Sequence, residues 1–402
     1  MRTESRSATS LTVERLLEPF SFSDFHDAYY EKQPLLIKRQ SPAFYDDLLT
    51  LQALNEHLGE VHLSSRALRL LRNGETLDSS KYTYARSSSN SRYGSGAVDK
   101  DAVFARFYEG YTINLIEYER NSTAMLRFRH DVERMFHAPA LANIYLTPRN
   151  AQGLVPHWDT HDTFILQFAG VKEWTIYDSP IALPASRQLP REGKWTLSEP
   201  TLKATLEPGD LLYLPRGFVH EARSGDAVSG HVTIGLFVFT YADLLRQIAD
   251  NADVDPWLRK ALPIDYQSVA SNDEFLRHVN QFFARADLPA YLERLHSDFA
   301  NDRLPDATDR MTDYVRLPSL DTDSRLRTRS VVCHALSAGG EEIVLAFNRK
   351  SLRFPPAAAE SIRYMIAAGE FTVSALPGDG QDNLSWCSTL VREGFLSIIA
   401  GR

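Results

Sequence analysis

Short runs of apolar and β-branched residues fill the middle of the chain, and their spacing predicts strands. The runs are separated by glycine, proline and aspartate, which are residues that end strands and form turns. Such a series is typical of an all-β barrel or sandwich rather than of alternating βαβ units. The runs read YTINLIEYER, ANIYLTP, DTFILQFAGVKEWTIY, ATLEPGDLLYLPRGFVHEA and SGHVTIGLFVFT.

Helical patterns lie on both sides of this β-rich region. Before it, residues 11–58 are predicted to be helical apart from Leu35–Ile37, a short β-like run that follows Pro34. After Thr240, aspartate and asparagine supply starts and stops for a mostly α-helical segment that reaches about Leu304. Its stretches read YADLLRQIADNA, NDEFLRHVNQFFARA and LPAYLERLHSDFANDRL.

The C-terminal region predicts a third unit of mixed structure. Strands are expected near SVVCHAL, EEIVLAFN and FTVSALPG, and a helix, AAAESIRYMIAAG, is expected to end at Gly369. A last helix, DNLSWCSTLVREG, leads to the strand FLSII. Two short helices with a terminal hairpin resemble a winged helix.

Residues 85–97, ARSSSNSRYGSGA, differ in composition from the rest of the chain. They are rich in serine and glycine and poor in apolar groups, so they predict a mobile loop, which is a candidate lid.

Composition narrows the classes of function. The 402 residues are 43% hydrophobic and 24% charged, which is enough apolar material for two or three buried cores. A net charge of -8 argues against general attraction to nucleic-acid phosphates. Cys333 and Cys387 are too few for a disulfide framework and are not spaced as a zinc site, so a reducing cytoplasm is expected. Neither a signal peptide nor a run of about eighteen apolar residues occurs, so neither export nor membrane spanning is expected.

The stretch PHWDTHD, which begins at Pro156, is the candidate metal site. Alternate side chains of a strand point to one face, so His157 and Asp159 are expected to project together. A third ligand, His220, comes from GDLLYLPRGFVHEA, in which a Pro-Arg-Gly bend delivers it onto the next strand. Two imidazoles and one carboxylate suit a redox-active divalent ion such as Fe(II) and leave positions open on one side.

Other interpretations of these histidines remain open. A lone His-x-Asp in a strand is most often structural or exposed to solvent, and His220 alone would be no stronger. His161 and His231 could compete as ligands. We prefer Asp159 to His161 because two histidines with one hard oxygen is the recurrent arrangement for redox iron, and His161 is then a residue that orients a ligand or a simple surface residue.

The residues around these ligands resemble a known family. NIYLTPRNAQGLVPHWDTHDTFILQFAGVKEWTIY, followed by GDLLYLPRGFVHEA and GHVTIG, resembles the JmjC-type cupin oxygenases, in particular the ribosomal-oxygenase branch that hydroxylates ribosomal proteins. YYEKQPLLIKR resembles the segment that precedes that catalytic domain. The resemblance implies a mixed, mainly β architecture with a double-stranded β-helix core. It also implies three units: 1–240, catalytic with an N-terminal helical extension; 241–305, helical and dimerising; and 306–402, winged-helix-like.

The same resemblance assigns roles to residues. It makes His157, Asp159 and His220 the ligands of Fe(II), with 2-oxoglutarate and O2 as cosubstrates. Lys172, fifteen residues after His157, stands where the family binds the distal carboxylate of the keto acid, although by itself it would be an exposed strand lysine. The remaining implied residues are Asn143 and Thr163, which line the cosubstrate cavity, and Tyr145, which faces the substrate or packs in the core.

The implied function is hydroxylation of an amino-acid side chain in a protein, with succinate and CO2 as coproducts. Relatives that hydroxylate histidine tend to place a small hydroxyl residue directly after HVTI, but this chain has Gly235, so no side chain there can bond the substrate. One alternative keeps the oxygenase and makes the substrate a precursor peptide or a small metabolite. Another makes the winged helix a DNA-binding regulator, although the basic groups in NRKSLRFPPAAAESIRYM are few. The helical segment is expected to form a homodimer, because its apolar stripes need a partner surface.

Overall fold

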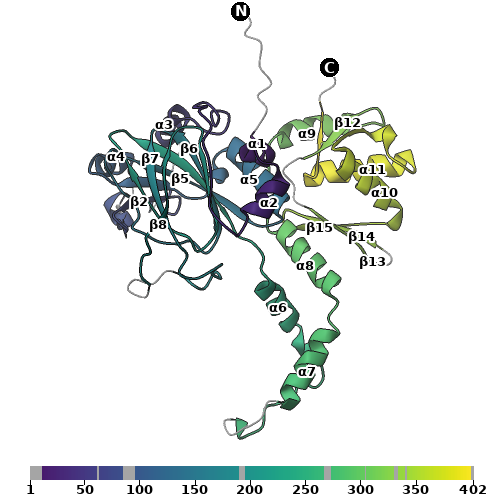
Figure 1. Cartoon of the computed structure of the whole chain (residues 1–402). Helices are drawn as coiled ribbons and strands as arrows, with labels where there is room; N and C mark the ends of the chain where they lie inside the picture. The colour runs from purple at the N-terminus through teal and green to yellow at the C-terminus, as the bar shows by residue number, and fades with distance from the viewer. Residues whose placement is uncertain are drawn as a thin grey trace, which may run out of the picture. The chain divides into compact units, whose positions relative to one another are not determined.

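The computed structural model of the chain divides into two compact units, residues 1–238 and 239–402 (Figure 1). Each is described by itself. The described residues are 11–60, 63–84, 96–189, 195–266, 273–303, 305–329, 334–339 and 342–399. Most of the predicted Ser/Gly-rich lid, 85–97, therefore lies outside the described residues.

Two facing antiparallel sheets form the first unit. The larger sheet has eight strands in the order β1-β9-β6-β11-β5-β4-β2-β3, and the smaller has the order β10-β7-β8. The strands are β1 (Leu35–Ile37), β2 (Leu68–Arg72), β3 (Glu75–Thr76), β4 (Thr112–Leu115), β5 (Ala140–Thr147), β6 (Asp162–Ala169), β7 (Lys172–Tyr177), β8 (Pro200–Leu206), β9 (Leu211–Leu214), β10 (Val219–Ser224) and β11 (Ser229–Leu236).

Helices of the first unit cover the outer face of the larger sheet. α5 (Thr123–Phe136) contacts β5, and α1 (Val13–Leu17) contacts both α5 and α2 (Phe22–Ala28). The N-cap of α5 is Ser122, whose hydroxyl accepts a hydrogen bond from the Met125 amide. The remaining helices are α3 (Leu51–Glu60) and α4 (Lys100–Tyr108).

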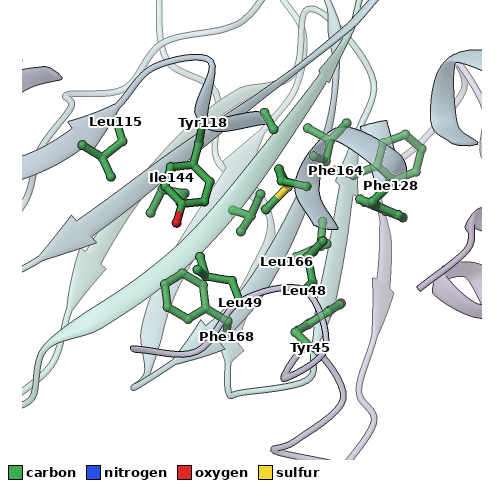
Figure 2. Packing of buried hydrophobic residues seen from close by; sticks show 14 of the residues in the cluster. Tyr45, Leu48, Leu49, Leu115, Tyr118, Phe128, Ile144, Phe164, Leu166 and Phe168 are labelled. Carbon is green, nitrogen blue, oxygen red and sulfur yellow. The ribbon is translucent and has the colours of Figure 1, made fainter. Parts of the chain in front are cut away.

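The larger sheet is buried on both faces, which explains why its strands read as nearly continuous apolar runs. Along β6, Phe164, Leu166 and Phe168 point to the outer face and join the main apolar core (Figure 2). Ile165 points the other way and packs against Trp174 of the smaller sheet. The two sheets therefore enclose an inner layer, where the polar residues described below gather.

The second unit begins with helices and ends in an α/β fold. α6 (Tyr241–Ala249), α7 (Asp273–Ala284) and α8 (Leu288–Asn301) lie within the predicted helical segment. Two three-stranded antiparallel sheets follow, β16-β12-β17 and β13-β14-β15. The other elements are α9 (Arg310–Arg316), β12 (Arg325–Thr328), β13 (Ala335–Gly339), β14 (Glu342–Phe347), β15 (Lys350–Phe354), α10 (Ala359–Ala368), β16 (Glu370–Thr372), α11 (Gly380–Glu393) and β17 (Leu396–Ile398).

Most of the predicted elements are present, and the differences have local causes. β1, α6, α7, α8, α10 and α11 occupy the predicted stretches, and Gly369 ends α10 with a positive φ of 69°. The prediction missed α5, although TAMLRFRHDVERMF has helical spacing, because the surrounding strand signals dominated that region. Much of the predicted strand FTVSALPG is a short 3-10 turn, Val373–Ala375, after only three strand residues. Among the described residues, no helix is both long enough and apolar enough to span a membrane.

Candidate metal centre

The first two candidate ligands lie in an extended segment that leads into β6. The sequence predicted a regular strand here, which is wrong: His157 forms only an isolated antiparallel bridge with His220, and β6 begins at Asp162. Pro156 carries no N–H for a longer ladder, and the bridge ends where the Asp159 carbonyl accepts from the Gly217 amide at 2.9 Å. The bridge still places the two imidazoles side by side.

The third candidate, His220, lies on β10 directly after the predicted Pro-Arg-Gly bend. Gly217 makes that bend possible, because its φ is 95° and a Cβ there would lie 2.7 Å from the Ile181 carbonyl oxygen. The His157 and His220 ring centroids are 4.4 Å apart, and His220 Nε2 lies 3.8 Å from Asp159 Oδ2. One ligand atom from each of the three side chains lies within 4.8 Å of the other two.

Backbone carbonyls fix which nitrogen of each imidazole faces the centre. His157 Nδ1 lies 2.9 Å from the Val155 oxygen, and His220 Nδ1 lies 3.0 Å from the Phe218 oxygen. A carbonyl only accepts, so Nδ1 carries the proton in both rings and Nε2 keeps its lone pair. This is the arrangement that holds metal-ligating histidines in the correct tautomer.

Electrostatics also favour metal binding by this group. Burial and the neighbouring His157 lower the pKa of His220 to about 4, so its ring is neutral at pH 7. Burial alone would raise the pKa of Asp159, but the surrounding imidazoles, led by His161, outweigh it and hold that pKa below its ordinary value. The centre therefore presents the neutral His220 imidazole and the Asp159 carboxylate anion, which are the protonation states that metal binding requires of these groups.

A cavity of about 300 Å³ opens between the two sheets beside these ligands. Alternation along the strands points one set of side chains into it and the other set into the outer core. From the larger sheet β5 contributes Asn143, Tyr145 and Thr147, and from the smaller sheet β7 contributes Lys172 and Trp174. Every site residue predicted from the sequence lines this cavity: Asn143, Tyr145, His157, Asp159, Thr163, Lys172 and His220.

Lys172 is the most unusual group in the cavity. It is the first residue of β7 and is only 4% exposed. Its Nζ donates to Thr147 Oγ1 at 2.9 Å, and no carboxylate of the described residues forms an ion pair with it. Burial lowers the pKa of Lys172 from 10.5 to about 7. The sequence suggested an exposed lysine as the ordinary alternative, and the structure excludes that alternative.

The other predicted cavity residues differ in what they contact. Asn143 Oδ1 accepts a hydrogen bond from the Glu117 amide at 3.0 Å, so its amide nitrogen remains for the cavity. The Thr163 hydroxyl lies 3.5 Å from Asp159 Oδ2. Tyr145 stacks on His231, with ring centroids 5.0 Å apart and planes 6° apart. Each of these residues therefore lines the cavity through a polar group or a ring face.

His161 and His231, the competing histidines, occupy other places. His231 lies on Tyr145 and against the edge of Trp174, at a ring distance of 5.4 Å, and burial holds its pKa well below the ordinary value. His161 stacks on Phe237 at 4.6 Å, and its Nε2 is 4.0 Å from Asp159 Oδ2. Neither belongs to the three-residue group found among the described residues. The position of His231 could not be predicted from the sequence without the strand register, which sets His231 opposite Tyr145.

Comparisons with known proteins agree with this geometry. Residues 114–244 match the JmjC domain family. The chain is 30% identical to ribosomal oxygenase 1 of Rattus norvegicus over 331 residues, which cover 75% of this chain and 53% of that protein. It is 31% identical over 305 residues to the Dictyostelium discoideum bifunctional lysine-specific demethylase and histidyl-hydroxylase NO66, covering 74% of this chain and 53% of that protein. The chain thus spans about half the length of these curated relatives.

Solved structures share the fold. Escherichia coli ribosomal oxygenase YcfD has a TM-score of 0.56 at 15% identity, over 94% of this chain and 98% of that chain. A structure of YcfD in complex with cobalt and 2-oxoglutarate gives 0.56 at 15% identity, over 95% and 99%. At this identity the likeness establishes the fold. The prediction of a mainly β, cupin-like JmjC core is therefore confirmed.

Proposed function

We propose that this ribosomal-oxygenase-like JmjC protein is an Fe(II)- and 2-oxoglutarate-dependent oxygenase that hydroxylates an amino-acid side chain of a ribosomal protein. One observation carries the proposal. A convergent pair of imidazoles with a carboxylate shares a cavity with a buried lysine that lacks an anionic partner among the described residues. The first group fits a metal ion and the second fits an anion.

The donor set fits Fe(II). His157 and His220 present Nε2 lone pairs and Asp159 presents a carboxylate oxygen, all from neighbouring backbone segments. Three ligands on one side of an ion leave coordination positions free for a cosubstrate and dioxygen. Bound there, the metal would supply the oxygen activation that couples decarboxylation of the keto acid to hydroxylation of a C–H bond.

Lys172 would hold the distal carboxylate of 2-oxoglutarate. A buried amine whose partner is only a hydroxyl is costly to protonate, and an anion bound in the cavity would stabilise the protonated, positively charged form. Thr147 accepts hydrogen bonds from the amine at 2.9 Å and from the Thr112 hydroxyl at 3.2 Å, so its own O–H is left to donate to the same carboxylate. The amine and the metal ligands then fix the two ends of a dicarboxylic keto acid.

The surrounding residues would position the rest of that cosubstrate and exclude water. Asn143, whose carbonyl is already bonded to the Glu117 amide, offers its amide nitrogen, and Thr163 steadies Asp159. Ile165 and Trp174 form the apolar wall between the sheets. An apolar wall that excludes water lowers the local dielectric constant and so strengthens the charge interactions inside the cavity.

The substrate class rests on the relatives. Proteins named ribosomal oxygenase 1 and bifunctional lysine-specific demethylase and histidyl-hydroxylase NO66 match about three quarters of this chain. A ribosomal protein as substrate, with the hydroxylated residue left open, is the assignment that their names support. Two cysteines in the whole chain support a reducing cytoplasm as the place of action.

Anaerobic reconstitution with Fe(II) tests the metal assignment. The wild-type protein should bind one equivalent of metal and consume 2-oxoglutarate, and His220→Ala should lose both properties. His26→Ala, which changes an exposed histidine of the first unit, is the matched control and should retain both. Full keto-acid consumption by His220→Ala would overturn the proposal.

Mass spectrometry tests the substrate. Ribosomal proteins from cells lacking the gene, incubated with the protein, Fe(II) and 2-oxoglutarate, should gain one oxygen atom with an equal yield of succinate. Oxygenation of small metabolites or precursor peptides, with none on ribosomal proteins, would support the alternative substrate class instead.

We further propose that the chain has three units, 1–240, 241–305 and 306–402, of which the last is winged-helix-like. The helical segment, 241–305, would mediate a homodimer. Apolar side chains along α6 and α7 support this proposal, because a solvated helix rarely keeps such a stripe without a partner. Tyr241 is 92% exposed, and Leu245, Phe275 and Leu276 are also exposed. Sedimentation equilibrium at micromolar concentration should give twice the chain mass, and a monomer mass would remove the claim.

A further inference from the structure

A row of polar side chains crosses the larger sheet and faces the cavity. Arg69 on β2 stands directly opposite Asn114 on β4, and Asn114 stands opposite Tyr145 on β5. Directly opposed side chains of an antiparallel pair lie about 5 Å apart. All three residues line the same cavity as the metal-ligand group. We call Arg69 and Asn114 together the cavity corner.

Asn114 has an unmet hydrogen-bond donor. It is only 4% exposed, and of the two N–H groups on its amide nitrogen at most one can be directed at the neighbouring Tyr145 hydroxyl, so at least one has no partner among the described residues. Leaving a buried donor unpaired is destabilising, so buried amide groups are normally hydrogen-bonded. Because this donor lines the cavity, a ligand that enters the cavity is the natural acceptor.

Arg69 adds a guanidinium beside that donor. It is exposed at the rim, and no ion pair or hydrogen bond to it is found in the described part of the chain. Arg72 on the same strand behaves differently, because it donates to the Glu109 carbonyl and lies over the Tyr111 ring. A guanidinium next to an amide donor matches the acceptors of a carboxylate.

The acidic groups lining the cavity are engaged elsewhere. Glu221 accepts hydrogen bonds from the Tyr177 hydroxyl at 2.6 Å and from Gln152 at 3.0 Å. Asp159 lies among the imidazoles of the candidate metal centre. Burial and then the Asp159 charge raise the pKa of Tyr145 to about 12, whereas a hydrogen bond from Asn114 and the Arg69 charge oppose that rise. Both Asp159 and the cavity corner therefore lie within electrostatic reach of Tyr145.

We propose that Arg69 and Asn114 form a subsite for a carboxylate of the protein substrate, so that the hydroxylated segment carries an aspartate or glutamate close to the oxidised residue. The keto acid does not need this subsite, because Lys172 is enclosed at Thr147 whereas Arg69 is open to solvent, where a protein segment arrives. The inference rests on the proposed function and adds the substrate's charge pattern to it.

Peptide selection tests the subsite without requiring turnover. The full chain, loaded with Zn(II) and 2-oxoglutarate, is incubated with degenerate peptides that are N-acetylated and C-amidated, so that carboxylates come only from side chains. Retained peptides are then sequenced by mass spectrometry. The wild-type protein should enrich aspartate or glutamate at one position, and Arg69→Met should bind such peptides about ten- to hundredfold more weakly.

Charge reversal and a matched control sharpen the test. Arg69→Glu should switch the enriched position to lysine or arginine, and Arg72→Met, which changes an arginine outside the cavity lining, should retain the wild-type preference. No acidic enrichment in the wild type, or the same enrichment in Arg69→Glu, would overturn the inference. Keto-acid consumption by the Fe(II)-loaded protein is measured separately, so failure of the oxygenase assignment is distinguishable from failure of the subsite.

Discussion

Replacing Lys172 with methionine should make the empty protein more stable while abolishing keto-acid binding. Methionine is close to lysine in length and lacks the charge. Burial lowers the pKa of Lys172 from 10.5 to about 7, and each pKa unit corresponds to about 1.4 kcal/mol. Below pH 7 the folded protein must carry this buried charge. The free energy of unfolding of Lys172→Met should therefore exceed that of the wild type by up to about 5 kcal/mol there.

The sign of the pH dependence follows from the depressed pKa. Between about pH 7 and 10.5 the unfolded chain binds more protons at Lys172 than the folded chain does, so wild-type stability rises with pH. The advantage of Lys172→Met should therefore be largest below pH 7 and shrink as the pH approaches 10.5.

Urea unfolding of the metal-free, keto-acid-free chain at pH 6 and pH 9 measures both effects. Lys203→Met, on the neighbouring strand β8, is the control and should change neither stability nor its pH dependence, because that lysine is exposed. Adding 2-oxoglutarate to the metal-loaded chains should further stabilise the wild type but not Lys172→Met. If Lys172→Met were no more stable than the wild type at pH 6, the reasoning that Lys172 is a buried amine without a compensating anion would be refuted.

Three further predictions concern the first unit. Because the pKa of Lys172 is about 7 in the free protein, keto-acid binding should take up a proton above pH 7 and weaken by up to about tenfold per pH unit, as calorimetry in two buffers would detect. Gly235→Ala places a Cβ 2.7 Å from His161 Cδ2 and should lower the free energy of unfolding by about 1–3 kcal/mol. Adding His161→Ala to the same chain removes the contact and should recover most of that loss in urea unfolding. Arg129→Met leaves the buried Glu119 and Glu133 without their shared cation and should lower the free energy of unfolding by about 3–5 kcal/mol; an unchanged urea midpoint would contradict this.

The elements and the candidate metal ligands could be predicted from the sequence because their signals are local. Strand-like runs bounded by glycine and proline located most strands of the first unit, and His-x-Asp with a later Pro-Arg-Gly bend pointed to His157, Asp159 and His220. Lys172 depended on resemblance to the JmjC oxygenases, because one lysine in a strand carries no signal of burial.

Only the tertiary structure decided the state of these groups, because burial and register depend on residues far apart in the chain. Two facing sheets leave Lys172 with a hydroxyl as its partner, and Phe218 and Val155 carbonyls set the imidazole tautomers. Strand order likewise places Arg69 beside a buried amide that is 45 positions away along the sequence. A pattern of residue types fixes which chemistry is available, but pairing of distant strands decides which charges and donors remain unmet.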